Sequence, residues 1–169
     1  KVDDLDTGNR FRKALPKALR AFFESTDPRG TPISAAGRLA LRGTPGQRET
    51  AVTASWDIDI HHAGTTITAG VDLENLHGRV NLKGSWDNEV IQGTGWLDIQ
   101  SVIINGYQIT DIAGPMLFQN DQFIIGSADV ASNLQDAKGP RAPDDSERVT
   151  AKFIGGKLVL DGIATLDEK

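Results

Sequence analysis

The chain has 169 residues, enough for one well-packed domain but too few to give two domains a substantial core each. Its formal net charge of −5 argues against nucleic acid as the main partner, because binding phosphates requires Lys and Arg clustered over one face. Cys is absent, which excludes disulfides, thiolate zinc sites and cysteine nucleophiles. With 18 Gly and 6% aromatic residues, the composition favours many short strands joined by tight turns.

The first predicted element is an amphipathic helix over residues 11–24. Apolar residues recur there at helical spacing, and most basic residues fall on the other side. The helix could cover one face of a following sheet or lie on an anionic membrane surface. We favour the first alternative, because a single sheet needs cover for its apolar face. The apolar residues of this stripe are Phe11, Leu15, Ala18, Leu19, Phe22 and Phe23.

From about residue 33 to residue 166 the apolar period changes to two, which is typical of half-buried strands. In the stretch 52–62, Trp56 and Ile58 fall on one face while Asp57 and Asp59 fall on the other. We expect roughly eight to ten strands, largely antiparallel because the connections are too short for helical crossovers. The predicted fold is mainly β: a curved antiparallel sheet or a sandwich, with the N-terminal helix packed on it, in one domain spanning residues 1–169.

Turn-forming residues predict where the strands are connected. The four predicted hairpin turns are Trp86–Glu89, Asn105–Gly106, Asn120–Asp121 and Ile154–Gly156, because each can adopt positive φ at low cost. The polar stretch 132–148 predicts a mobile loop.

A heptad with the pattern Gly-basic-apolar-x-Leu-x-Gly recurs along the chain. It reads GRLALRG at 37–43, GRVNLKG at 78–84 and GKLVLDG at 156–162, and a looser copy, GPMLFQN, begins at Gly114. The four starts are separated by 41, 36 and 42 residues, a spacing that indicates a repeated supersecondary unit. A partial copy begins at Gly95. We expect the glycines to mark turns and the aliphatic positions to share one face of a sheet.

Catalytic and metal sites have little support in the sequence. Asp57, Asp59 and His61 alternate along one strand face and are weak candidates for a metal site, to which His62 and His77 could add nitrogen ligands. A solvated polar face explains the same pattern more simply, so we predict no metal and no other cofactor. Nucleophile motifs are absent, and we predict that the chain is not an enzyme.

Glycine-and-aliphatic stretches give the chain a resemblance to the AsmA-like proteins of the bacterial cell envelope. They are DPRGTPISAAGRLALRG from Asp27, LENLHGRV from Leu73, the run from Gly93 to Val130, and GGKLVLDG from Gly155. The resemblance covers roughly residues 27–166. It implies a periplasm-facing or envelope protein that is anchored through a membrane segment outside these residues. The start at Lys1, rather than at Met, agrees with a piece of a longer chain.

What the resemblance implies is a non-enzymatic segment whose apolar sheet face contributes to a groove for phospholipid transport or outer-membrane assembly. Expected partners are phospholipid acyl chains and flanking segments of the same long chain; no nucleic acid and no membrane span within these residues is expected. The alternative is a carbohydrate-binding or structural β-sandwich module of an envelope protein, with Trp96, Tyr107 and the face of Asp57, Asp59 and His61 exposed for polar ligands. The candidate lipid-facing or core residues are Leu39, Leu41, Val80, Leu82, Leu97, Ile99, Met116, Phe118, Leu158 and Leu160.

Overall fold

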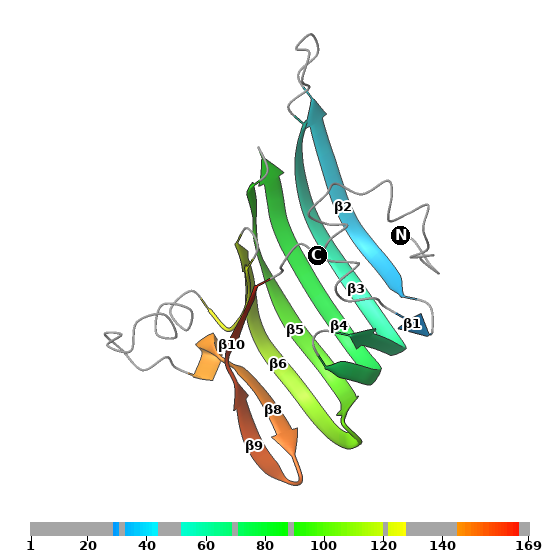
Figure 1. Ribbon diagram of the computed structural model, residues 1–169. Coiled ribbons are helices and arrows are strands. Elements are labelled where there is room, and N and C mark those ends of the chain that lie inside the picture. Colours follow the sequence, from blue (N-terminus) through cyan, green and yellow to red (C-terminus); the bar gives the residue numbers. More distant parts are fainter. Residues whose placement is uncertain are drawn as a thin grey trace, which may run out of the picture.

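The computed structural model describes residues 29–30, 33–43, 52–68, 71–87, 90–119, 122–127 and 145–165. These residues form one curved, open sheet of ten strands in which every pairing is antiparallel (Figure 1). The prediction of a mainly β, antiparallel and curved fold is therefore confirmed. Of the two predicted architectures, a curved sheet and a sandwich, the structure is the curved sheet. The helix predicted over residues 11–24 lies outside the described residues.

Consecutive hairpins build the centre of the sheet, because each strand from β2 to β6 pairs with the next one along the chain. On each side of this centre, two strands lie end to end along the same neighbouring strand. β1 and β2 both lie along β3, while β7 and β8 both lie along β6, with β10 beyond β7 and β9 beyond β8. The strands are β1 (Arg29–Gly30), β2 (Ser34–Gly43), β3 (Val52–Thr68), β4 (Asp72–Asp87), β5 (Val90–Ile104), β6 (Tyr107–Gln119), β7 (Gln122–Ile125), β8 (Val149–Phe153), β9 (Gly156–Leu160) and β10 (Gly162–Thr165).

The central strands are longer than the short strands that the composition predicted. β3 has 17 residues, β4 has 16 and β5 has 15. Gly64, Asn75 and Asp111 take positive φ inside strands β3, β4 and β6 and do not end them. Next to each, the strand register shifts by a β-bulge or similar irregularity. A small polar residue or Gly can adopt this conformation at low cost, so the chain bends within each strand without ending it.

The glycines of the repeated heptad do not mark turns, so this prediction is wrong for three of the four copies. Gly37, Gly78 and Gly114 lie inside β2, β4 and β6. A Cβ atom on Gly78 would lie 2.6 Å from the Cα atom of Ile99 on β5, and one on Gly114 would lie 2.6 Å from the Cα atom of Val149. These glycines permit a close approach between neighbouring backbones.

Gly37 has the same role, because its Cβ atom would lie 2.6 Å from the Cα atom of Ile58. The fourth glycine, Gly156, differs. It opens β9 after a turn, and its closest contact of this kind is 3.4 Å from the carbonyl oxygen of Phe153. The repeat is therefore structural in three copies: a strand with an internal glycine, packed against a β-branched residue of a neighbouring strand.

Hairpin turns fall where the sequence predicted them. Asn105 and Gly106 connect β5 to β6 with φ values of 51° and 81°, and Ile154 and Gly155 connect β8 to β9 with 46° and 76°. Both are two-residue turns with positive φ at both positions, the geometry that matches the twist of the flanking strands. The breaks between β4 and β5 and between β6 and β7 coincide with the other two predicted turns.

The chain leaves the sheet after β7 and returns to it before β8. Gly126 donates its backbone N–H to Pro115 at 2.9 Å, and Ser127 donates to Glu147 at 2.8 Å. A short 3₁₀ helix, η1 (Asp145–Glu147), precedes the return. β7 and β8 therefore lie along β6 as two parts of one strand position. The predicted mobile loop 132–148 overlaps this excursion; residues 132–144 lie outside the described residues.

The core lies on one face of the sheet, across β4, β5, β6, β8 and β9. Its buried members are Leu76, Ile99, Val102, Ile112, Val149 and Ala151. Val149 is completely buried and Val102 is nearly so. Ile99 and Ile112 lie opposite each other in register, as alternation predicts. Val102 lies three residues after Ile99 but joins the same cluster, because the register of β4 and β5 shifts between the two positions.

Candidate functional site

The ten apolar residues singled out in the sequence all lie on the same face of the sheet, which we call the apolar face. Residues directly opposite each other on paired strands project to the same side. Val80 lies opposite Leu97, and Leu39 lies opposite Trp56. The remaining candidates join this face through equivalent pairs: Leu41 with Ala54, Leu82 with Ile58, Ile99 with Ile112, Met116 with Gly95, Phe118 with Phe123, Leu158 with Ala151 and Leu160 with Val149.

Burial along the apolar face changes from one edge of the sheet to the middle. Ile99 and Met116 are buried, and Val80, Leu97, Leu158 and Leu160 pack against the core. Near the other edge, Leu39 and Leu41 are 61% and 65% exposed. The ten residues thus share a face but divide between core and surface, and β2 carries the solvent-exposed end of that face.

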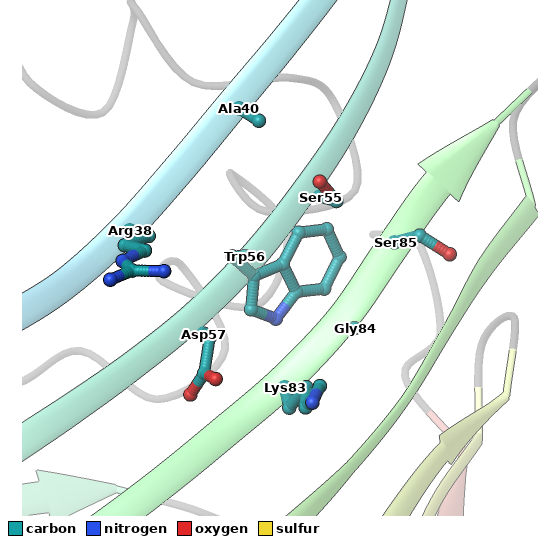
Figure 2. Close-up of a pocket in the computed structure, with 8 residues that line it drawn as sticks. All are labelled: Arg38, Ala40, Ser55, Trp56, Asp57, Lys83, Gly84 and Ser85. Atoms are coloured by element: carbon teal, nitrogen blue, oxygen red, sulfur yellow. The ribbon is translucent and has the colours of Figure 1, made fainter.

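Trp56 occupies the apolar face beside this exposed end. It lies opposite Gly84, and a Cβ atom on Gly84 would come within 2.8 Å of the indole ring. The absence of a side chain at position 84 makes room for the ring. An open hollow of about 400 Å³ lies at the same three strands (Figure 2). Trp56 and Gly84 line it from the apolar face, and its other lining residues belong to the opposite face: Arg38, Ala40, Ser55, Asp57, Lys83 and Ser85.

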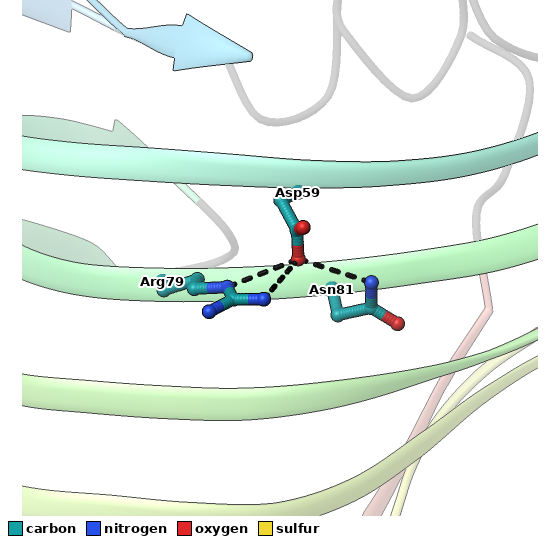
Figure 3. Close-up of polar contacts among 3 residues, drawn as sticks. All are labelled: Asp59, Arg79 and Asn81. Atoms are coloured by element: carbon teal, nitrogen blue, oxygen red, sulfur yellow. Dashed lines mark hydrogen bonds and ion pairs between the residues drawn. The ribbon is translucent and has the colours of Figure 1, made fainter. Parts of the chain in front are cut away.

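The opposite side of the sheet is the polar face, where Asp59 is held by two residues of β4. Arg79 donates to Oδ1 of Asp59 from Nη2 at 2.8 Å and from Nε at 3.0 Å, and Asn81 donates to the same oxygen at 3.1 Å (Figure 3). The hydrogen bond from Asn81, followed by that from Arg79, lowers the pKa of Asp59 below its usual value. The carboxylate is therefore neutralised by a fixed cation from within the sheet.

The other weak metal candidates have similar surroundings on the polar face. Asp57 lies between Arg38 and Lys83 in the strand register, and His61 lies opposite Arg79. Among the residues that the structure describes, no three His, Asp or Glu side chains form a group that could hold a metal ion. These positions alternate basic and acidic groups across three strands, as a solvated salt-linked face does.

His62 and His77 do not join Asp57, Asp59 and His61. His62 lies opposite Gly78 on the apolar face, and His77 contacts the side-chain oxygen of Asn75 at 3.0 Å. Burial, with a smaller contribution from the charge of His61, lowers the pKa of His62 to about 4. Its Nδ1 atom and the hydroxyl of buried Thr65 have no hydrogen-bond partner among the residues that the structure describes. The direction of His62 could have been predicted from the sequence, because adjacent residues of a strand face opposite ways and His61 belongs to the polar face.

Trp96 is the exposed aromatic residue of the polar face. It lies between Asn81 and Pro115 in register and is 48% exposed. The alternation with Leu97 predicted this direction correctly. Trp96 is a flat apolar surface beside an amide side chain, a combination suited to stacking on a sugar ring.

Comparisons with protein-family models, with curated proteins and with solved structures found no match to this chain. In the part of the chain that the structure describes, no helix is long and apolar enough to cross a membrane. The site is therefore defined by its own geometry: a broad apolar face, exposed at the β2 end, on a sheet whose two outer positions do not pair with each other.

Proposed function

We propose that this chain is a non-enzymatic segment of an AsmA-like, periplasm-facing envelope protein, and that its apolar face contributes to a groove for phospholipid acyl chains. Such a segment would serve phospholipid transport or outer-membrane assembly. The observation that supports it most is the exposure of Leu39 and Leu41 on an apolar face that continues into the core. Exposed aliphatic side chains next to one another are costly in water unless something apolar covers them.

The open form of the sheet supports the same proposal. Within the described residues, β2 bonds to β3 alone, and on the far side β9 and β10 bond to β8 and β7 alone. An apolar face that does not close on itself leaves room for a long, flexible ligand, and acyl chains need no specific polar partner. Flanking segments of a longer chain could extend the face by pairing at either edge.

Acyl-chain binding can be tested at the exposed end with a matched pair of substitutions. Replacing Leu41 by Asp, or Leu39 by Asp, puts a charge on the apolar face, whereas Ala40→Asp puts the same charge between them on the polar face. Covering a Leu side chain contributes about 1.5–3 kcal/mol, so we expect L41D to weaken binding of a fluorescent phospholipid by about tenfold or more. A40D should bind within about twofold of the wild type.

The readouts are titration with the fluorescent phospholipid and native mass spectrometry of the purified chain for co-purified phospholipid. All three positions are already exposed, so the folded state should tolerate each change. If L41D and A40D bind the probe equally well, the apolar face is not the binding surface and the proposal fails.

A second function, carbohydrate binding, has the support of Trp96. Its exposed ring on the polar face, with Asn81 and Pro115 beside it, is an arrangement that could stack on a sugar and donate hydrogen bonds to its hydroxyls. The two functions use opposite faces of the same sheet. Binding on a glycan array by a chain that carries no phospholipid would favour this second function.

A further inference from the structure

Two hairpin turns lie side by side at one end of the sheet, the lower end in Figure 1. The start of β6 pairs with the end of β8, as in Thr110 opposite Lys152, so the turn before β6 neighbours the turn after β8. The rings of Tyr107 and Phe153 meet there edge to face, with centroids 5.8 Å apart and planes at 75°. We call Tyr107, Phe153 and Ile154 the hairpin tip.

Ile154 is an unusual residue for its position. It takes a φ of 46° and is 84% exposed. Positive φ strains a β-branched side chain, and exposure leaves its apolar surface in water. The neighbouring turn has the same geometry with Asn105 and Gly106, the pair that such turns favour. Local folding would therefore prefer Asn at position 154, and an exposed Ile there indicates a contact made by the tip itself.

The size and surroundings of the tip fit a lipid bilayer better than a protein partner. A stable protein interface covers about 800 Å² on each side, whereas an aromatic side chain buries about 150–250 Å², so three side chains fall well short. Tyr107 is 61% exposed and combines an apolar ring with a hydroxyl, the type of residue that is enriched at membrane–water interfaces.

Basic residues lie next to the hairpin tip on β8 and β9. Lys152 and Lys157 lie opposite each other on β8 and β9, both exposed on the polar face, and Lys152 also pairs with Asp111 at 3.0 Å. Lysines next to an inserted apolar group can reach anionic lipid headgroups. Phe153 continues the line of Ala151 and Val149, so the tip is joined to the apolar face.

We propose that the hairpin tip inserts into the surface of a phospholipid bilayer, with Ile154 and Tyr107 among the acyl chains and the lysines at the headgroups. This inference rests on the proposed function, because it supplies the contact through which acyl chains would enter or leave the apolar face.

Sedimentation of the whole chain with vesicles of phosphatidylethanolamine and phosphatidylglycerol tests this inference through Ile154→Asn. The variant recreates the Asn-Gly turn found at 105–106, so it should resist denaturant better than the wild type while binding vesicles about tenfold less tightly. Ile154→Leu keeps an apolar side chain and should bind like the wild type. Val90→Asn, which changes an exposed apolar residue at the other end of β5, should also bind like the wild type.

Equal vesicle binding by I154N and the wild type would overturn the inference, and so would a wild-type chain that stays in solution. A tip that binds protein instead would give the second result. The proposed function is tested separately, because L41D lies at the far edge of the sheet and should lose the phospholipid probe but keep vesicle sedimentation. If the wild-type chain binds the phospholipid probe but does not sediment with vesicles, the proposed groove stands and the proposed tip contact fails. If it sediments with vesicles but does not bind the probe, the tip contact stands and the groove fails.

Discussion

His62 and Asp59 show how neighbouring positions of one strand acquire opposite electrostatic roles. Asp59 projects to the polar face, where Asn81 and Arg79 stabilise its charged form. His62 projects to the apolar face, where burial favours its neutral form and lowers its pKa to about 4 from 6.5. An odd separation along the strand places the two on opposite faces.

The lowered pKa of His62 predicts a loss of stability in mild acid. Between about pH 6.5 and pH 4 the unfolded chain binds a proton that the folded chain does not, so the free energy of unfolding falls as the pH falls through this window. The shift corresponds to a loss of up to about 3 kcal/mol. We expect His62→Gln, which cannot titrate, to flatten this dependence in urea unfolding between pH 7 and pH 4.

Asp59 provides a contrast within the same experiment. Because its pKa is lowered, its contribution is complete above the unfolded value of 3.8 and is lost only below that pH. Asp59→Asn should therefore leave the slope between pH 6.5 and pH 4 unchanged. A wild-type slope that survives in H62Q would show that another group carries the pH dependence.

At the scale of strands, the internal glycines decide how closely neighbouring strands approach. Gly78 and Gly114 have φ values of 149° and 151°, which side chains disfavour, and each faces the backbone of a neighbouring strand, β5 for Gly78 and β8 for Gly114. Gly162 has no atom of the described residues within 4 Å of its Cβ position. Glycines that look alike in the sequence therefore differ in what they permit.

Substitution by Ala should separate these two kinds of glycine. We expect Gly78→Ala and Gly114→Ala to lower the free energy of unfolding by at least about 2 kcal/mol each, since the new methyl group meets backbone atoms and the backbone conformation is strained. Gly162→Ala should change it by less than about 0.5 kcal/mol. Chemical unfolding of the three variants measures this difference, and equal stabilities would show that the close approach is not needed.

The sequence predicted strand direction and face more reliably than strand length. The ten apolar candidates share one face because alternation is a local property that survives in the folded chain. Strand ends were harder to predict, because Asn75 and Asp111 have turn-forming side chains yet sit in bulges. Whether such a residue ends a strand or bends it depends on the neighbouring strand, which one sequence does not display. The hairpin tip was missed for a related reason, since the pairing of β6 with β8 brings residues 107 and 153 together.

For the whole molecule, the excursion between β7 and β8 is an insertion into one strand position. Gly126 and Arg148 both occupy the place opposite Asp161, because Gly162 pairs with Ile125 while Leu160 pairs with Val149. Arg148 also forms an ion pair with Asp161 at 3.5 Å. The two halves of the position would be in register if Gly126 were followed directly by Val149.

Deletion of residues 127–148 tests this geometry. We expect the shortened chain to keep its sheet, with the circular dichroism of a β protein and one cooperative unfolding transition, because Ile125 and Val149 would continue the alternation towards the apolar face. A parallel variant that deletes residues 127–147 leaves one extra residue and should shift the register by one. If the two deletion variants are equally stable, β7 and β8 do not form one continuous strand along β6.

The sheet order also limits how copies of the chain could associate. Across the sheet the path runs through seven strands with every neighbour antiparallel, so β2 at one margin and β9 and β10 at the other point in the same direction. If the apolar faces of both copies stay on the same side, two unlike margins would meet with parallel strands, whereas two like margins related by a two-fold axis perpendicular to the sheet would meet antiparallel. Because the path across the sheet has an odd number of strands, symmetric pairing with a continuous apolar face, and not head-to-tail stacking, preserves the antiparallel hydrogen-bond pattern of the molecule.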